Sequence, residues 1–598
     1  MRMRPLLAVS ALAAALALAG CGKKADLDQP LAYAPADSVF LLGNLEPVPD
    51  AALDAWWKNS EQMMTMYDRV LDDALADIET ADSNATVVAV AKALREELRG
   101  KFNRAGFESL GFTGAARSAF YGIGLVPVAR MELGDADKFR AFLGRVETRA
   151  GVKMPEAEIA GQKYWTITGG DAKAGALMAI QGKHLVLTVA PAAPSEALLK
   201  QVLGIDRPAT DALSAGTLEA FTKERGWLPY GSGYVDSVRL AAALTGERGA
   251  IEQEFLRALG VDAEATTSTP ECKAEFGAIA AAVPRLSFGY AALEPKSMDL
   301  RYVIETAPEH GKGLAGLAAD VPGLDGTGEG MLDVGFGLDL DAFAGFVNLR
   351  AAKVAESPFR CAALASLNDD IAKMNADLAN PAVFMAGAAV SGVNLSLSKL
   401  ELPEGGTPVL AGKVAIGSDN PASLLSMAGG FVPQLASLNL QPGAAPVAMP
   451  AGLLPPTAPP AHVALGDKAL AISLGAGEET GLAAFAAAPA GKPAPLLHYG
   501  VDSRGMLAFM DAMAKTSETQ LAAAEARAAV AEPVDADGDG QPDPGSEETA
   551  ANDVAELREA MEMFKAMRGA YVDTIDRVDF ALYATERGLE AHYTLKLK

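Results

Sequence analysis

Acidic side chains recur at alternate positions shortly before residue 540. Asp535, Asp537 and Asp539 stand at positions 1, 3 and 5 of a short segment, Gly540 follows at position 6, and Gln541 supplies a backbone carbonyl at position 7. Oxygen atoms at this spacing form the beginning of a cage for Ca²⁺, a hard cation that prefers oxygen ligands. An acidic, solvated linker is the alternative interpretation. The predicted calcium ligands are Asp535, Asp537, Asp539, Gln541, Asp543 and Glu547.

The segment resembles the calcium loops of the EF-hand type and their shorter relatives in extracellular repeat proteins. It departs from that pattern at its end, because position 12 is Ser546 and the acid Glu547 comes one residue later, and because Pro542 replaces an apolar residue. Residues 506–530 and 547–567 are predicted to be helices, which would place the loop 535–548 at the tip of a helical hairpin. We therefore expect Ca²⁺ to have a structural role there.

The chain begins with a segment that has the composition of an export signal. A basic start, Met1-Arg-Met-Arg4, precedes an apolar run from Leu6 to Ala19 and then Leu18-Ala-Gly-Cys21. The run is too short to span a bilayer comfortably, and small residues precede the cysteine. These residues resemble the lipobox of bacterial lipoproteins, which implies cleavage after residue 20 and a lipid on Cys21. The alternative is an ordinary signal peptide with an incidental cysteine.

The lipobox resemblance also implies a location. Gly22 follows the cysteine where an Asp would favour retention in the inner membrane, so the resemblance implies sorting to the outer membrane, facing the periplasm, in a cell with two membranes. Residues 1–20 are then the signal peptide, and residues 21–36 are a lipidated tether. Several buried acyl chains, each methylene contributing about 0.8 kcal/mol, are enough for stable attachment.

Two cysteines remain once Cys21 is assigned to the lipid. Cys272 and Cys361 would lie in an oxidising compartment, where a leftover pair is more often bonded than free. We therefore predict a disulfide between Cys272 and Cys361. Two separate buried thiols are the alternative.

No catalytic motif is present in the sequence. The five histidines, at positions 184, 310, 462, 498 and 592, are scattered singly and show no spacing typical of a metal site. The chain has neither a Gly-x-Ser-x-Gly nucleophile elbow nor a phosphate-binding loop. A hydrolase with a dispersed carboxylate site stays an alternative, because its acids need meet only in the fold.

The charge of the chain restricts its partners. The 598 residues carry a formal net charge of −25, which becomes −27 once residues 1–20, with two arginines and no acid, are removed. Such a surface repels phosphate backbones and anionic lipid head groups, so nucleic acid is excluded as a partner. Contact with the membrane is expected through the N-terminal lipid.

Weak self-similarity links the two halves of the chain in the same order. The four similar pairs are residues 40–45 and 334–340, 179–188 and 464–473, 234–237 and 500–503, and 285–304 and 577–595. Two of these pairs predict β-hairpins. Asp236 and Asp502 stand between a strand and a helix, and they are predicted to cap helix N-termini rather than to act in catalysis.

The repeats and the alternation of strands and helices predict an α+β fold. We expect two homologous tandem domains, 37–306 and 331–598, each with a mixed or antiparallel sheet, joined by a Gly- and Pro-containing linker at 307–330. Residues 420–466 contain no Asp, Glu, Lys or Arg. This uncharged segment is predicted to be an apolar flap against the protein, with a contact surface for a lipid or a partner as the alternative.

Together these features favour a lipid-anchored envelope protein that acts as a non-enzymatic binding or structural scaffold for another envelope component. One alternative is a carrier or sensor for an apolar ligand held between the sheets and the helices. The other alternative is the hydrolase with a dispersed acidic site.

Overall fold

A computed structural model of the whole chain provides the fold. It describes residues 28–58, 85–168, 173–246, 249–260, 268–380, 389–401, 409–435, 438–450, 452–455, 458–530 and 572–598, with isolated positions at 72, 75 and between 554 and 568. The signal segment 1–20, Cys21 and the acidic loop 535–548 lie outside these residues.

Helices and strands alternate along the whole described chain. The elements of the first half are η1 (Pro30–Tyr33), β1 (Phe40–Gly43), α3 (Ala85–Leu98), α4 (Arg104–Ser109), β2 (Ser118–Ile123), β3 (Val126–Glu132), α5 (Ala136–Ala150), β4 (Glu156–Ile159), β5 (Gln162–Ile167), β6 (Ala174–Gln181), β7 (His184–Pro191), α6 (Glu196–Val202), α7 (Thr217–Arg225), β8 (Ser232–Asp236), α8 (Ser237–Thr245), α9 (Ala250–Ala258), α11 (Pro270–Ala282), β9 (Arg285–Glu294) and β10 (Ser297–Glu305). The elements of the second half are α12 (Pro308–Leu314), β11 (Leu332–Gly337), α13 (Leu340–Glu356), α14 (Ser366–Leu378), β12 (Gly392–Glu401), β13 (Val409–Gly417), α16 (Pro421–Phe431), β14 (Val447–Ala448), β15 (Ala461–Leu465), β16 (Ala469–Leu474), α17 (Leu482–Ala486), β17 (Leu497–Asp502), α18 (Ser503–Val530), β18 (Ile575–Thr585) and β19 (Gly588–Leu597).

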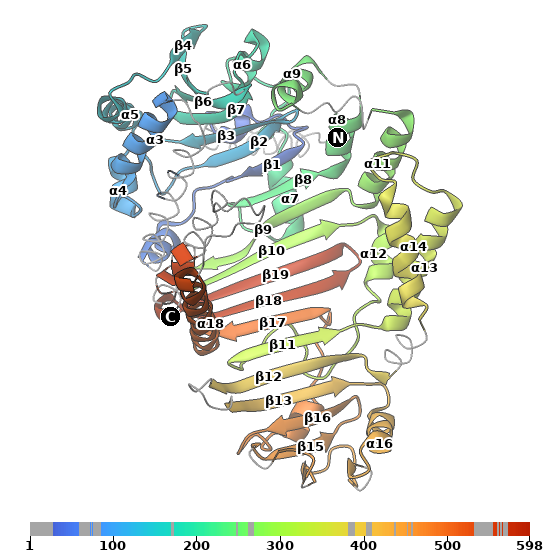
Figure 1. The fold of residues 1–598 in the computed structure, drawn as a ribbon. Coiled ribbons are helices and arrows are strands. Elements are labelled where there is room, and N and C mark those ends of the chain that lie inside the picture. The colour runs from blue at the N-terminus through green and yellow to red at the C-terminus, as the bar shows by residue number, and fades with distance from the viewer. Residues whose placement is uncertain are drawn as a thin grey trace, which may run out of the picture.

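All named strands belong to one sheet, in which each neighbouring pair is antiparallel (Figure 1). From edge to edge the order is β4-β5-β6-β7-β3-β2-β1-β8-β9-β10-β19-β18-β17-β11-β12-β13-β16-β15-β14. The two halves of the chain therefore meet edge to edge where β10 pairs with β19. The prediction of an α+β fold with antiparallel strand pairing is confirmed, but the strands of both halves form one continuous sheet and not a separate sheet in each half.

The strand order is symmetric about the β10–β19 pair. Moving outward, the first half runs β10-β9-β8-β1-β2-β3-β7-β6, and the second half runs β19-β18-β17-β11-β12-β13-β16-β15. The four similar sequence pairs fall on equivalent strands in these two series.

The predicted helix caps are confirmed in both halves. The Asp236 carboxylate accepts a hydrogen bond from the backbone N–H of Arg239 at 2.9 Å, at the start of α8. Asp502 accepts hydrogen bonds from the N–H groups of Arg504 and Gly505, each at 2.9 Å, at the start of α18. Each aspartate satisfies N–H groups that have no partner within the helix, which explains an acid at this position.

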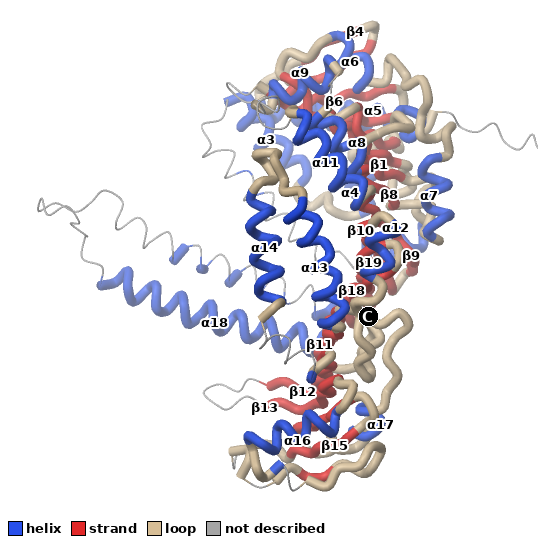
Figure 2. Tube along the Cα trace, turned by 90° about the vertical axis from the view of Figure 1, so that its right-hand side faces the viewer, coloured by secondary structure: helices blue, strands red, loops and turns tan. Residues whose placement is uncertain are grey.

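The two faces of the sheet are covered by different elements. On the face that we call the covered face, η1 and α7 pack in the first half, where Leu31, Tyr33 and Phe221 are buried against β2, β3 and β8. In the second half α17 packs there through Leu482. Figure 2 shows the sheet edge-on, with α7 and α17 on one side and α3, α13, α14 and α18 on the other.

The segment predicted to be a linker packs against the protein. Residues 307–330 include α12, and Leu317, Val321 and Leu324 are buried. Leu324 lies against Gly335 of β11, where a Cβ atom would overlap its side chain. A glycine is needed there because the covering loop approaches the strand so closely.

On the opposite face, which we call the apolar face, described helices pack on the two outer parts of the sheet, and α18 also contacts the middle strands β12, β17 and β18. At one end α3 and α5 pack on Met131, Leu185 and neighbouring residues of β3 and β7. At the other end part of the uncharged segment, including Leu425 of α16, packs on Val463 and Ile472. The flap interpretation fits this packing, although Phe431 at the end of α16 is 85% exposed.

A disulfide bond connects the two halves away from the sheet. The Cys272 and Cys361 Cα atoms are 4.6 Å apart, and the bond ties α11 of the first half to the segment that precedes α14 of the second. Leu364, Phe276 and Phe359 pack around it. Among the described residues, no helix is both long and apolar enough to cross a bilayer.

Candidate functional site

Rows of apolar side chains run across the middle of the apolar face. Side chains that are directly paired between strands point to the same face, so the register defines each row. One row consists of Phe288, Tyr302, Ala591, Leu582, Leu497, Phe336 and Val393, on β9, β10, β19, β18, β17, β11 and β12. The neighbouring row consists of Tyr290, Leu300, Tyr593, Phe580, Tyr499, Val334 and Leu395 on the same strands.

These two rows define what we call the open apolar face, because no residue in them is fully buried. Tyr302 and Phe336 are each 48% exposed, and Tyr499 is 42% exposed. Leu286 and Ile304, in the next row, are each 43% exposed. Figure 1 shows these strands from this side, with α18 at one end of them and α11 and α13 at the other. Contiguous exposed apolar surface of this kind marks a site of interaction.

Many of the intervening positions on the covered face carry polar side chains, although Val303 and Ala581 there are apolar. A row across the same strands contains Asp299, Thr594, Asp579, Gly500, Asp333 and Ser396. An antiparallel sheet with one solvated face normally buries its apolar side and exposes its polar side. The middle of this sheet does the opposite, since Asp333 and Asp579 are buried while Tyr302 and Phe336 are half exposed. This inversion singles out the open apolar face as a candidate binding surface.

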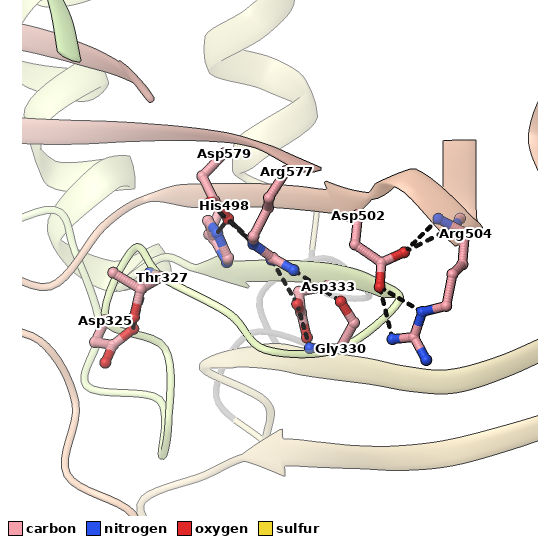
Figure 3. A network of polar contacts seen from close by, with 10 residues as sticks. Asp325, Thr327, Gly330, Asp333, His498, Asp502, Arg504, Arg577 and Asp579 are labelled. Carbon is pink, nitrogen blue, oxygen red and sulfur yellow. Dashed lines mark hydrogen bonds and ion pairs between the residues drawn. The ribbon is translucent and has the colours of Figure 1, made fainter. Parts of the chain in front are cut away.

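The buried polar side chains on the covered face form one network centred on Arg577 (Figure 3). The Arg577 guanidinium donates to Asp579 at 2.9 Å, to Asp333 at 2.7 Å and to the carbonyl oxygen of Gly330 at 2.7 Å. His498 Nε2 lies 3.4 Å from Asp579. The network thus joins β11, β17, β18 and the loop that precedes β11.

The geometry of this network favours a structural role over a catalytic one. Burial alone would raise the pKa of Asp579, but hydrogen bonds from His498 and Arg577 lower it below its usual value. A general acid of a hydrolase needs a raised carboxyl pKa, because it must hold a proton at neutral pH. Both carboxylates are instead neutralised by one arginine in a buried site, an arrangement that fixes strands and loop.

The covered face of the first half has a different cluster of polar side chains. The Tyr33 ring lies between two guanidinium groups, with the Arg130 group 3.6 Å and the Arg207 group 3.4 Å from the ring centroid. His184 is fully buried beside them. Burial, followed by the positive charge of Arg130, lowers the pKa of His184 to about 4. The imidazole is therefore neutral at pH 7 and has no charge to offer an anion.

The structure tests some of the predicted site residues and leaves others outside the described part of the chain. Cys272 and Cys361 are brought together by the fold. Cys21 and the loop 535–548 fall outside the described residues, so the lipid and calcium assignments stay predictions. Within the described part of the chain, no group of three or more His, Cys, Asp or Glu side chains is arranged to hold a metal ion.

The open apolar face was not predicted from the sequence. The sequence signal for this face is the recurrence of apolar residues at every second position in β10, β11 and β17. In β10 these residues are Leu300, Tyr302 and Ile304, with a polar residue between Leu300 and Tyr302. Alternation predicts that one face of a strand is apolar, but it does not predict whether another layer covers that face. No family model, curated protein or solved structure matches the chain.

Proposed function

We propose that this chain is a lipid-anchored envelope protein that acts as a non-enzymatic binding scaffold, with the open apolar face as its binding surface. One observation carries the proposal. The middle of the sheet exposes uncharged apolar side chains over seven adjacent strands while it buries charged ones on the opposite face. Exposure of such a surface to water is unfavourable, and its burial against a binding partner would be favourable.

The proposed anchor is a lipid on Cys21 at the outer membrane, facing the periplasm. Only six residues lie between Cys21 and Asp28, the first described residue, and the seven steps along the chain span about 25 Å at most when extended. Asp28 accepts a hydrogen bond from Tyr33, whose helical turn packs on the covered face. An anchor at Cys21 would therefore hold the body close to the bilayer from its covered side, with the open apolar face on the other side.

We further propose that the two halves are homologous tandem domains. The symmetric strand order, the four similar sequence pairs and the equivalent caps of Asp236 and Asp502 support this origin. The proposed duplication accounts for the size of the open apolar face. Two domains, each with an uncovered strand pair at its edge, would join through β10 and β19 and so double the exposed apolar width.

Calcium at the acidic loop is proposed as a structural addition to this scaffold. The loop would connect α18 to the last strand pair, β18 and β19, which lies at the centre of the sheet. Asp535, Asp537, Asp539 and Asp543 repel one another at neutral pH, and a bound Ca²⁺ would remove that repulsion.

The binding role is tested by crosslinking in intact envelopes. A photoreactive benzoylphenylalanine replaces Tyr302 or Phe336, and affinity-purified adducts are identified after irradiation. The same group at Phe431, which is exposed on α16, is the matched control. We expect adducts from positions 302 and 336 that are at least tenfold more abundant than those from position 431. Equal labelling at all three positions would contradict the proposal.

The anchor is tested separately. Metabolic labelling with palmitate should mark the wild-type chain, and a Cys21→Ser variant should be unlabelled and should leave the membrane fraction. A Cys21→Ser variant that stays fully membrane-bound would refute the anchor and leave the binding role standing.

A further inference from the structure

We infer that the open apolar face binds the acyl chains of individual zwitterionic membrane lipids, an inference that rests on the binding role proposed above. The floor of this site is the surface of the two apolar rows, from β9 to β12. Four properties of the described residues identify the occupant: the polarity of the floor, its dimensions, the helices beside it and the charge of the chain.

No charged side chain lies in the two rows of the floor. The polar side-chain atoms in its two rows are the hydroxyls of Tyr290, Tyr302, Tyr499 and Tyr593. Protein interfaces are enriched in Arg as well as in aromatic residues, and they surround an apolar centre with a polar rim. Hydrocarbon chains need no hydrogen bonds, and their burial is favourable in proportion to the apolar area removed from water. An uncharged floor of aliphatic and aromatic side chains therefore matches hydrocarbon better than it matches polypeptide.

The dimensions of the floor match those of acyl chains. On β10 the apolar side chains extend from Met298 to Ile304, which is about 20 Å at the usual rise of a strand. The hydrocarbon of one bilayer leaflet is about 15 Å thick, half of the 30 Å core, so an acyl chain fits along the strands. From β9 to β12 the floor is about 29 Å wide, at about 4.8 Å between strands. That width accommodates several chains side by side.

The arrangement of helices favours individual lipids over an intact bilayer. In Figure 2, α13, α14 and α18 stand out from the sheet on the side of the apolar face. The helix α18 has 28 residues and is about 42 Å long. A flat bilayer cannot reach the floor past helices of this length, whereas a lipid that has left the membrane can lie between them. The proposed anchor, which leaves from the covered face, also places the floor away from the membrane.

The negative charge of the chain favours a zwitterionic lipid head group over an anionic one. A formal charge of −25 repels anionic head groups and has no such effect on a zwitterionic one. The head group would lie at an end of the strands, beyond the apolar rows. We therefore expect phosphatidylethanolamine to bind better than phosphatidylglycerol with the same acyl chains.

Lipid transfer from vesicles tests the inference directly. The full chain with Cys21→Ser, which has no acyl group of its own at that position, is incubated with palmitoyl-oleoyl phosphatidylethanolamine and phosphatidylcholine vesicles. Protein is then separated from vesicles by gel filtration, and the lipid that elutes with it is measured by mass spectrometry. We expect the protein to carry at least one lipid per chain. Replacing phosphatidylcholine by phosphatidylglycerol should enrich the bound fraction in phosphatidylethanolamine relative to the vesicles.

Charged variants locate the bound lipid. Tyr302→Glu and Phe336→Glu each place a carboxylate on the floor at a half-exposed position, and we expect each to lower the bound lipid at least tenfold. Phe431→Glu is the matched control, because it adds the same charge at an exposed site on α16. Equal loss in all three variants, or in none, would overturn the inference. Bound lipid that is richer in phosphatidylglycerol than the vesicles would overturn the head-group assignment.

A second measurement needs no variant that might misfold. A phosphatidylethanolamine with a diazirine in its acyl chain is bound and irradiated, and the modified peptides are mapped. We expect adducts in β10, β11 and β17; adducts confined to the uncharged segment 420–466 would overturn the inference. If no lipid binds but positions 302 and 336 crosslink a protein in envelopes, the lipid inference fails and the binding role stands. If these positions crosslink neither, both fail.

Discussion

Replacing Arg577 by methionine should destabilise the centre of the second half more than any surface substitution. Methionine fills a similar volume but removes every charged hydrogen bond to Asp333 and Asp579. Asp333 would then keep only the backbone N–H of Gly330 and Asp579 only His498, and breaking a buried ion pair in this way costs about 3–5 kcal/mol. Since 1.4 kcal/mol corresponds to a factor of ten, local opening should become roughly 10²- to 4 × 10³-fold more frequent.

Hydrogen exchange measures this opening strand by strand, without requiring a single unfolding transition. The amides of β11, β17 and β18 should lose protection by that factor at pH 7, while those of β6 and β7 in the first half should change little. Arg504→Met is the matched control. Its ion pair with Asp502 is exposed on the arginine side, so its loss should cost less than about 1 kcal/mol.

The effect of Arg577→Met should depend on pH with a definite sign. Asp579 has a lowered pKa in the wild-type protein, so its contribution to stability is present at neutral pH and is lost as the pH falls through the folded-state pKa. Without Arg577 the pKa of Asp579 should rise. Protonation of Asp579 should therefore reduce the loss of stability in the variant as the pH is lowered. A variant that keeps full protection of β11, β17 and β18 at pH 7 would refute the account of a buried, charge-paired network.

Three further predictions concern stability. The buried, neutral His184, with a pKa of about 4, should make the protein less stable as the pH falls from about 6.5 to 4, by up to about 3 kcal/mol; urea unfolding at a series of pH values should show this slope, and His184→Phe should remove it. Converting Cys272 and Cys361 to alanine opens an 89-residue loop and should cost at most about 4–5 kcal/mol; thermal unfolding under non-reducing conditions that is identical for the two forms would contradict a structural bond. Adding several millimolar Ca²⁺ should raise the melting temperature through the loop 535–548, and Asp537→Ala should abolish that rise; an unchanged melting temperature in the wild-type chain would count against the calcium assignment.

Local features of the fold could be predicted because they depend on neighbouring residues. The hairpins β9–β10 and β18–β19 follow from alternating apolar side chains around short polar turns. The caps at Asp236 and Asp502 follow from an acid between a strand and a helix. The disulfide partners followed from elimination, since two cysteines remained once Cys21 was assigned.

Features that depend on distant residues could not be predicted from one sequence. Asp333 and Arg577 are 244 positions apart, and no local pattern indicates that they pair. The union of the two halves through β10 and β19 is equally non-local, because either strand could have formed a free edge. The openness of the apolar face depends on where α13, α14 and α18 lie, which is set by tertiary packing and not by the strands themselves.

Solvent access to Tyr499 in the cell tests the central claim most directly. In a Tyr499→Cys variant the new thiol would lie in the middle of the open apolar face, and Phe431→Cys provides an exposed reference on α16. We expect maleimide to label both positions in the purified, delipidated protein. In intact envelopes labelling at position 499 should fall at least tenfold while position 431 stays reactive, because the binding partner covers the face. Equal labelling of position 499 in both settings would contradict the claim that this face is a binding surface.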